Sequence, residues 1–117
     1  MRIMISLPMN GRTDTEITMR LRDLTAKFNI LHIDVIDSFV IDESPDDVYN
    51  LSVYKLGRTI MNCLSKVDAV YFDEGWEKAR GCRIERLICE SYGIQIFDQR
   101  NFAIDNKEIP KWVYIMN

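Results

Sequence analysis

The sequence has little of what several common kinds of functional centre need. It contains one histidine, His32, and three cysteines that do not stand in closely spaced pairs. Zinc sites need clustered cysteine and histidine ligands, and catalytic triads need a histidine beside a nucleophile, so both kinds of centre are disfavoured. The odd number of cysteines indicates reduced, space-filling thiols in a reducing compartment. We expect neither a metal nor a cofactor.

The chain also lacks an excess of positive charge and any long apolar run. Fifteen Lys and Arg residues against eighteen Asp and Glu residues give a net charge of −3, so no overall positive field attracts a nucleic acid polymer or an anionic membrane. No apolar run approaches membrane-spanning length, and the N-terminus shows no signal-peptide pattern. We therefore expect a cytoplasmic protein whose partner is a small molecule.

What is present predicts one α/β domain over residues 1–117. A hydrophobic content of 47% in 117 residues is enough for one core, and no repeat, low-complexity tract or linker marks a boundary. Short apolar segments, expected to be strands, alternate with amphipathic, helix-like stretches. This order predicts a Rossmann-like or flavodoxin-like three-layer sandwich with a mostly parallel sheet of four to five strands. Trp112 to Met116 is expected to be buried, as a last strand or a subunit contact.

Two helix starts carry recognisable capping signals. Thr13 and Glu16 have the spacing of a capping box, and an apolar stripe follows at helical spacing. Ser44 and Pro45 predict the start of a second helix, with serine as the N-cap and proline in the first helical position. The second helical pattern runs to residue 67 and has a potential break near Asn50.

The third helix is expected to follow residue 81 and to end at Gly93. Its apolar positions, with a period near 3.6, are Ile84, Leu87, Ile88 and Tyr92. This pattern predicts that Ile84, Leu87 and Ile88 bury one side of the helix and that Glu85 lies at the margin of the buried side.

The strand patterns place the expected ligand site. Residues 31–35 alternate between apolar and polar, which predicts an edge strand, and residues 69–72 are apolar on both faces, which predicts a central one. In such sheets ligands bind at the carboxyl ends of the strands. The loops from Ser6 to Arg12 and from Asp73 to Gly81 should therefore border the site.

The same loops carry a family resemblance. The segments Met4 to Gly11 and Val67 to Phe72, then Gly75 with Trp76, and Arg80 to Glu85, resemble a branch of the nucleoside 2-deoxyribosyltransferase-like superfamily that is common in bacteriophages. The similarity covers roughly residues 2 to 97. It implies a Rossmann-like fold, a nucleoside or nucleotide ligand, a homo-oligomer, and a glutamate that attacks the anomeric carbon of the sugar. By position that glutamate is Glu85.

The residues themselves support this role for Glu85 in part. Cleavage of an N-glycosidic bond passes through an oxocarbenium-like state that one fixed carboxylate can trap covalently. Glu85 is near the first turn of its predicted helix, and helical side chains lean toward the N-terminus, where the ligand is expected. An exposed helix glutamate near the positive end of the helix dipole is the alternative interpretation.

Two positions depart from the family pattern. Related enzymes carry a serine or an aspartate six residues before the glutamate, and here that position is Ala79. Some carry an aspartate eight residues before the one that opens the third strand, and here that position is Ile60. Catalysis would then need another acid, and Asp73 is the best candidate for protonating the leaving base or orienting water. Otherwise, Asp73 is expected to cap backbone amides.

Further residues are predicted to hold the ligand. The first loop joins a strand to a helix, where free amides favour anions. Arg12, Arg80 and Arg83 are expected to contact a phosphate or a ribose if they are not solvated surface residues, and Trp76 either stacks on a base or packs over the core. The predicted ligand-binding set is Ser6, Pro8, Met9, Asn10, Gly11, Arg12, Gly75, Trp76, Arg80, Gly81 and Arg83.

Three functional hypotheses remain open. The first is an N-glycosidase or deoxyribosyltransferase-like enzyme with Glu85 as nucleophile. The second is a non-catalytic nucleotide-binding protein, for example a phage protein that sequesters a signalling nucleotide of host immunity, and Ala79 and Ile60 favour it. The third is a structural or interaction protein without a ligand.

Overall fold

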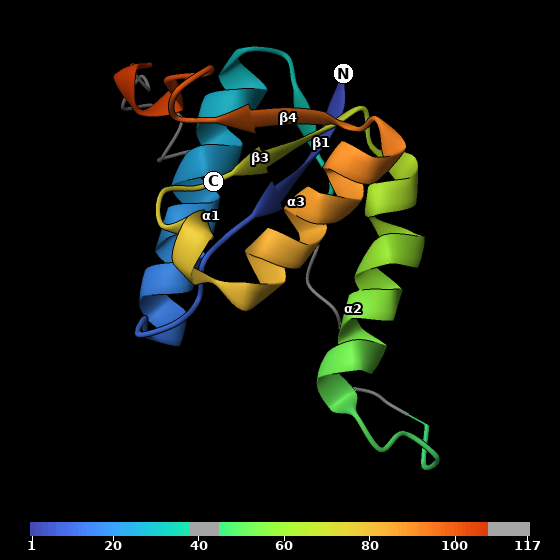
Figure 1. Cartoon of the computed structure of the whole chain (residues 1–117). Coiled ribbons are helices and arrows are strands. Elements are labelled where there is room, and N and C mark those ends of the chain that lie inside the picture. The colour runs from blue at the N-terminus through green and yellow to red at the C-terminus, as the bar shows by residue number, and fades with distance from the viewer. Residues whose placement is uncertain (38–44, 108–117) are drawn as a thin grey trace.

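The computed structural model describes residues 1–37 and 45–107 and contains a parallel sheet with helices packed against it (Figure 1). The strands are β1 (Arg2–Ser6), β2 (Asp34–Val35), β3 (Ala69–Phe72) and β4 (Gln95–Asp98). They lie in the order β2-β1-β3-β4, and every pairing is parallel. The helices are α1 (Asp14–Ile30), α2 (Leu51–Asn62) and α3 (Arg80–Tyr92), with short 3-10 helices at Leu64–Lys66, Trp76–Lys78 and Ile104–Asn106. The predicted α/β fold of the Rossmann-like or flavodoxin-like kind is confirmed.

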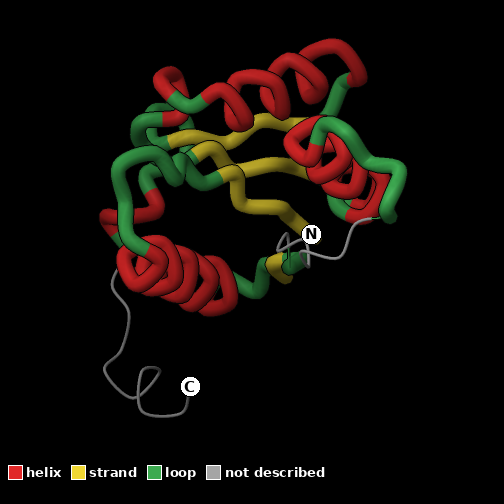
Figure 2. Tube along the Cα trace, turned by 90° about the horizontal axis from the view of Figure 1, so that it is seen from below, coloured by secondary structure: helices red, strands yellow, loops and turns green. Residues whose placement is uncertain are grey.

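The sheet divides two hydrophobic clusters, so the molecule has three layers (Figure 2). Because successive side chains of a strand point to opposite faces, Ile3 and Ile5 join α1 on one side while Met4 joins α3 on the other. Residues 69–72 are buried throughout, as predicted for a central strand. The three cysteines are all buried, which confirms their role as core-filling thiols.

The start of α1 was predicted correctly and that of α2 was not. Thr13 and Glu16 form both hydrogen bonds of a capping box. α2 begins at Leu51, because Asn50 is its N-cap and accepts a hydrogen bond of 3.0 Å from the amide of Val53. Pro45 instead begins a turn that the amide of Val48 closes, and Ser44 lies outside the described residues. The short polar side chain of Asn50 therefore outweighs the proline signal.

The edge strand was predicted in the right place but too long. α1 continues to Ile30, and the amides of Leu31 and His32 still bond to carbonyls of its last turn. His32 takes a positive φ of 59°, which turns the chain away from the helix. Only Asp34–Val35 then pairs with β1, because the preceding residues are used to end the helix.

The buried side of α3 also differs from the prediction. Leu87 and Tyr92 are 60% and 81% exposed, whereas Cys82 and Cys89 are buried. Their spacing of seven residues places them on one side of the helix, which packs against β3 through these small side chains. Ile88 packs against the same cluster, as predicted, and Glu85 is half-buried at the edge of this side of the helix. Gly93 ends the helix with a φ of 69°, as predicted.

Candidate functional site

The two loops predicted to hold the ligand begin side by side. Ser6, the last residue of β1, pairs with Phe72, the last residue of β3, and the amide of Asp73 donates to the carbonyl of Ser6 at 3.1 Å. The chain leaves β1 toward β2 on one side and leaves β3 toward β4 on the other. This point, where the strand order reverses, is the ligand crevice of open α/β sheets.

Glu85 is anchored at this crevice by Ser6. The hydroxyl of Ser6, a residue only 2% exposed, donates a hydrogen bond of 3.0 Å to Oε1 of Glu85. Burial raises the pKa of Glu85 from 4.5 to about 7, and the Ser6 hydrogen bond opposes part of this rise because it favours the ionised form. A carboxyl group with a pKa near neutrality can exchange a proton, or act as an anion, at physiological pH.

Two cavities meet at Glu85. The first has a volume of about 480 Å³ and is lined by Leu7, Met9, Asn10, Ala79, Arg80, Gly81, Cys82 and Glu85. The second, of about 710 Å³, lies between α2 and α3 and shares Met9, Arg80, Gly81 and Glu85 with the first. Its other lining residues are Asn50, Ser52, Val53, Lys55, Leu56, Thr59 and Ile84. We call the two together the Glu85 groove, and Glu85 is the one acidic residue among the described residues that line it.

The N-terminus of α3 opens into the first cavity. Ala79 is its N-cap and makes no side-chain capping bond, since alanine has no acceptor. The first helical bond runs from the amide of Arg83 to the carbonyl of Ala79, so the amides of residues 80–82 precede it. Uncapped amides and the positive end of the helix dipole favour an anion at this place. Arg80, a residue of the first turn that lines both cavities, adds a full positive charge.

Asp73 is held on the other face of the sheet. Its two carboxylate oxygens accept hydrogen bonds of 2.9 and 2.7 Å from Nε and Nη2 of Arg20 on α1. Arg20 also contacts Asp105, and these carboxylates raise its pKa above the ordinary value. Asp73 is 1% exposed and lines neither cavity of the Glu85 groove. Sequence reasoning did not find Arg20 as its partner, because the two residues are 53 positions apart.

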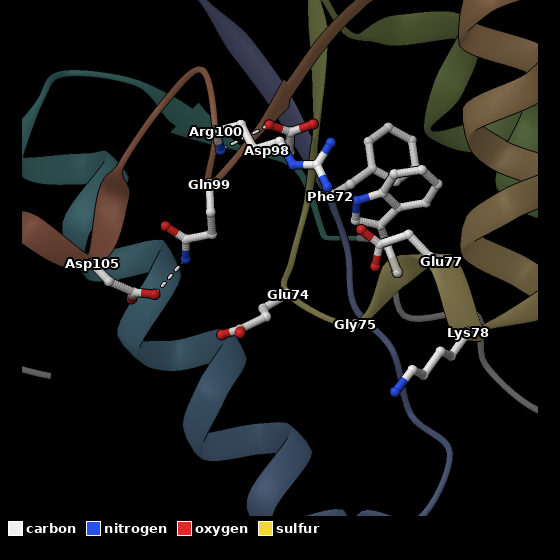
Figure 3. A pocket seen from close by; sticks show the side chains of 10 residues that line it. Phe72, Glu74, Gly75, Glu77, Lys78, Asp98, Gln99, Arg100 and Asp105 are labelled. Carbon is white, nitrogen blue, oxygen red and sulfur yellow. Dashed lines mark hydrogen bonds between the residues drawn. The ribbon is translucent and has the colours of Figure 1, made fainter.

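Trp76 and Gly75 line a separate cavity of about 560 Å³ near the ends of β3 and β4. Figure 3 shows Gln99 and Asp105 on one side of it, Glu77 and Lys78 on the other, and Glu74 between them. The guanidinium carbon of Arg86 lies 4.0 Å from the centroid of the Trp76 ring, and Arg86 also bonds to Asp98 at 3.2 Å. One face of the indole is therefore occupied by a cation from α3.

The structure thus brings together part of the predicted site. Ser6, Met9, Asn10, Arg80, Gly81 and Glu85 gather at the Glu85 groove, where Ser6 contacts Glu85 and the others line the walls. Gly75 and Trp76 lie at the separate cavity, whereas Pro8, Gly11, Arg12, Asp73 and Arg83 line none of these three cavities. Sequence reasoning did not place Cys82 in the site, although Cys82 lies within the Arg80 to Glu85 segment that carries the resemblance, and it missed the α2 side of the groove, which no motif marks.

Comparison of the chain with protein-family models, with curated proteins and with solved structures gives no match. Within residues 1–37 and 45–107, no group of three or more His, Cys, Asp or Glu side chains is arranged to hold a metal ion. In the same part of the chain, no helix has the length and apolar character needed to cross a membrane.

Proposed function

We propose that the Glu85 groove binds a nucleoside or nucleotide and that the Glu85 carboxylate attacks the anomeric carbon of its sugar. One observation carries the proposal: a carboxylate fixed by a buried serine lies at the carboxyl ends of β1 and β3, between two cavities. The resemblance to the nucleoside 2-deoxyribosyltransferase-like superfamily supports the same residue.

The proposed reaction has two displacements. An oxygen of Glu85 forms a bond to the anomeric carbon while the bond from that carbon to the base nitrogen breaks, and the base leaves with the electron pair and takes a proton from solvent. Water, or a second base, then attacks the same carbon, releases Glu85 and gives up its proton. With a pKa of about 7, a substantial fraction of Glu85 is ionised at neutral pH, and the cationic character of the sugar in the transition state favours that form.

The two cavities suit different parts of a nucleotide. The α3 amides and Arg80 favour a phosphate in the first cavity, because both are positive and no acid other than Glu85 lines it in the described residues. The second cavity offers the apolar side chains of Val53, Leu56 and Ile84 for the faces of a base, with Thr59 and Asn50 as hydrogen-bonding groups. The sugar between them would lie against Glu85.

A non-catalytic nucleotide-binding protein is the second candidate, and three observations favour it. Ala79 supplies no polar group where related enzymes have one, and Asp73 is bound by Arg20 away from the groove. No second acid of the described residues lines the groove to protonate a leaving base. In this case Glu85 accepts hydrogen bonds from sugar hydroxyls, and the protein sequesters its nucleotide unchanged.

A product assay combined with calorimetry separates the two functions. The wild type and Glu85→Gln are incubated with a panel of nucleosides and nucleotides, free base is measured by chromatography, and affinity is measured by titration calorimetry. An enzyme releases base, and Glu85→Gln lowers that release by several orders of magnitude while affinity is kept. A binder releases no base, and Glu85→Gln weakens affinity by about 1.5 to 3 kcal/mol.

Glu90→Gln is the matched control, because Glu90 is an exposed glutamate on the same helix, and it should change neither quantity. If no panel member binds or is cleaved, or if Glu85→Gln behaves as Glu90→Gln does, the proposal is wrong.

A further inference from the structure

The second cavity of the Glu85 groove is bordered by the starts of two helices. Asn50 and Ser52 belong to the start of α2, and Arg80 and Gly81 belong to the start of α3. Both helices begin toward the lower end of the molecule in the view of Figure 1. The first amides of a helix have no partner within the helix, so this border of the cavity is rich in hydrogen-bond donors.

The N-cap of α2 fixes which way the side-chain amide of Asn50 is turned. Its Oδ1 accepts a hydrogen bond of 3.0 Å from the amide of Val53. Nδ2 carries protons and cannot accept this bond, so the oxygen must face the helix and Nδ2 must lie on the other side of the amide. Within residues 1–37 and 45–107, no protein group accepts a hydrogen bond from Nδ2. Because Asn50 is exposed and lines the cavity, Nδ2 can donate to a ligand.

Groups that accept hydrogen bonds are scarce on the same wall. Lys55 and Arg80 can only donate, whereas the hydroxyls of Ser52 and Thr59 can donate or accept. Among the described residues that line the cavity, Glu85 is the one side chain that acts only as an acceptor when ionised. The proposed function assigns Glu85 to the sugar. The edge of a base in this cavity would therefore meet mainly donors.

We infer that the second cavity selects bases that carry an oxo group, such as hypoxanthine or uracil, over the matching amino bases adenine and cytosine, with Nδ2 of Asn50 donating to the oxo oxygen. This inference rests on the proposed function, because it takes the base to lie in the second cavity. An oxo oxygen satisfies Nδ2, whereas an exocyclic amino group would set one donor against another and leave both unpaired. The apolar side chains of Val53, Leu56 and Ile84 contact the face of either kind of base, so the selection depends on the polar edge. It applies whether the groove cleaves its nucleotide or only binds it.

Titration calorimetry of the full chain with two matched pairs of 5′-monophosphates tests the inference. One pair is that of inosine and adenosine, and the other is that of uridine and cytidine, so that the members of a pair differ at the oxo or amino position. In each pair that binds, the wild type should bind the oxo member at least about 10-fold more tightly.

Asn50→Asp is the decisive variant, because aspartate caps a helix as well as asparagine does and replaces the donor Nδ2 by an acceptor oxygen. The ratio of oxo to amino affinity should fall at least about 10-fold, to parity or below. The added negative charge repels the phosphate of both members alike, so it cancels in this ratio. Asn29→Asp is the matched control, since Asn29 is an exposed residue of α1 that lines none of the three cavities, and it should leave the ratio unchanged. Circular dichroism confirms that both variants keep their helices.

The outcomes separate this inference from the proposed function. Equal binding of the two members of each pair, tighter binding of the amino member, or the same ratio in Asn50→Asp and Asn29→Asp would overturn the inference. The proposed function would stand in these cases, because the nucleotides still bind. If none of the four monophosphates binds, the proposed function fails and the inference fails with it.

Discussion

Ser6 and Glu85 are 79 residues apart in the sequence, and a hydrogen bond of 3.0 Å joins the hydroxyl of one to the carboxylate of the other. The bond connects the end of β1 with the second turn of α3 and fixes where the carboxylate lies. In related enzymes the polar residue that accompanies the glutamate stands six positions before it, and in this chain that position is Ala79. In this chain β1 supplies the serine that contacts the glutamate.

The first prediction concerns the pKa of Glu85. Because the Ser6 hydroxyl donates to the ionised carboxylate, Ser6→Ala should raise this pKa above about 7. Carbon-13 NMR of the glutamate carboxyl groups, recorded over a pH series, measures the change. Ser65→Ala is the control, since the Ser65 hydroxyl bonds to the carbonyl of Met61 on the surface. A Glu85 titration that is the same in Ser6→Ala and wild type would show that the hydrogen bond is not formed in solution.

The second prediction is that Glu85→Gln stabilises the fold at high pH. Burial raises the pKa of Glu85 from 4.5 to about 7, so the folded protein binds a proton more tightly than the unfolded chain. The cost of ionising the buried group is absent below pH 4.5, grows between pH 4.5 and 7, and is complete above pH 7. Glutamine does not ionise, so this cost is absent from Glu85→Gln at every pH. The gain in unfolding free energy from Glu85→Gln should be small at pH 5 and reach roughly 1 to 3 kcal/mol at pH 8.

Urea unfolding at the two pH values measures that gain, with Glu77→Gln as an exposed control. If Glu85→Gln and wild type differ by the same amount at pH 5 and pH 8, Glu85 is not a buried, titrating group.

The sequence predicted those features of the fold that depend on residues within a single helix or strand. The capping box at Thr13, the fully apolar β3 and the glycine at the end of α3 depend on neighbours within a few residues, and each was predicted correctly. The start of α2 was predicted wrongly because the sequence offers two N-cap signals, one at Ser44 with Pro45 and one at Asn50. Which of them begins the helix depends on contacts with other parts of the chain, and these leave no local pattern.

The candidate site was predictable only where its residues belong to the two loops at the strand ends. The buried side of α3 was predicted only in part: Ile88 packs on the cluster as expected, but periodicity gave weight to the exposed Leu87 and little to the smaller Cys82 and Cys89 that pack on the sheet. Contacts between distant segments left no local signal. The pairing of Asp73 with Arg20 and the α2 wall of the groove are of this kind.

The third prediction concerns the ion pair of Arg20 and Asp73. Arg20→Met would leave the nearly inaccessible carboxylate of Asp73 without its cation, and the loss in unfolding free energy should be about 3 to 5 kcal/mol. Lys27→Met is the matched control, because Lys27 is on the same helix and pairs with the more accessible Asp23 and Asp105. It should cost less than about 1 kcal/mol. Urea unfolding measures both losses. Equal losses for the two variants would mean that the pairing with buried Asp73 is not the main contribution of Arg20 to stability.

The last prediction uses two arginines of the same helix. Arg80 lines both cavities of the Glu85 groove, whereas Arg83 lines neither of them, although both are exposed residues near the start of α3. If the N-terminus of α3 binds a phosphate, Arg80→Ala should weaken the binding of a nucleotide by about 1.5 to 3 kcal/mol, the usual value of a hydrogen bond to a charged group. It should leave the affinity for the matching nucleoside almost unchanged, because only the phosphate meets the guanidinium. Arg83→Ala should change neither affinity.

Titration calorimetry of the two variants with one nucleoside and its 5′-phosphate measures all four values, and raising the salt concentration should reduce the Arg80 effect. Equal losses for nucleoside and nucleotide in Arg80→Ala would mean that this arginine supports the groove rather than a phosphate, and equal losses in the two variants would mean that net charge alone attracts the ligand.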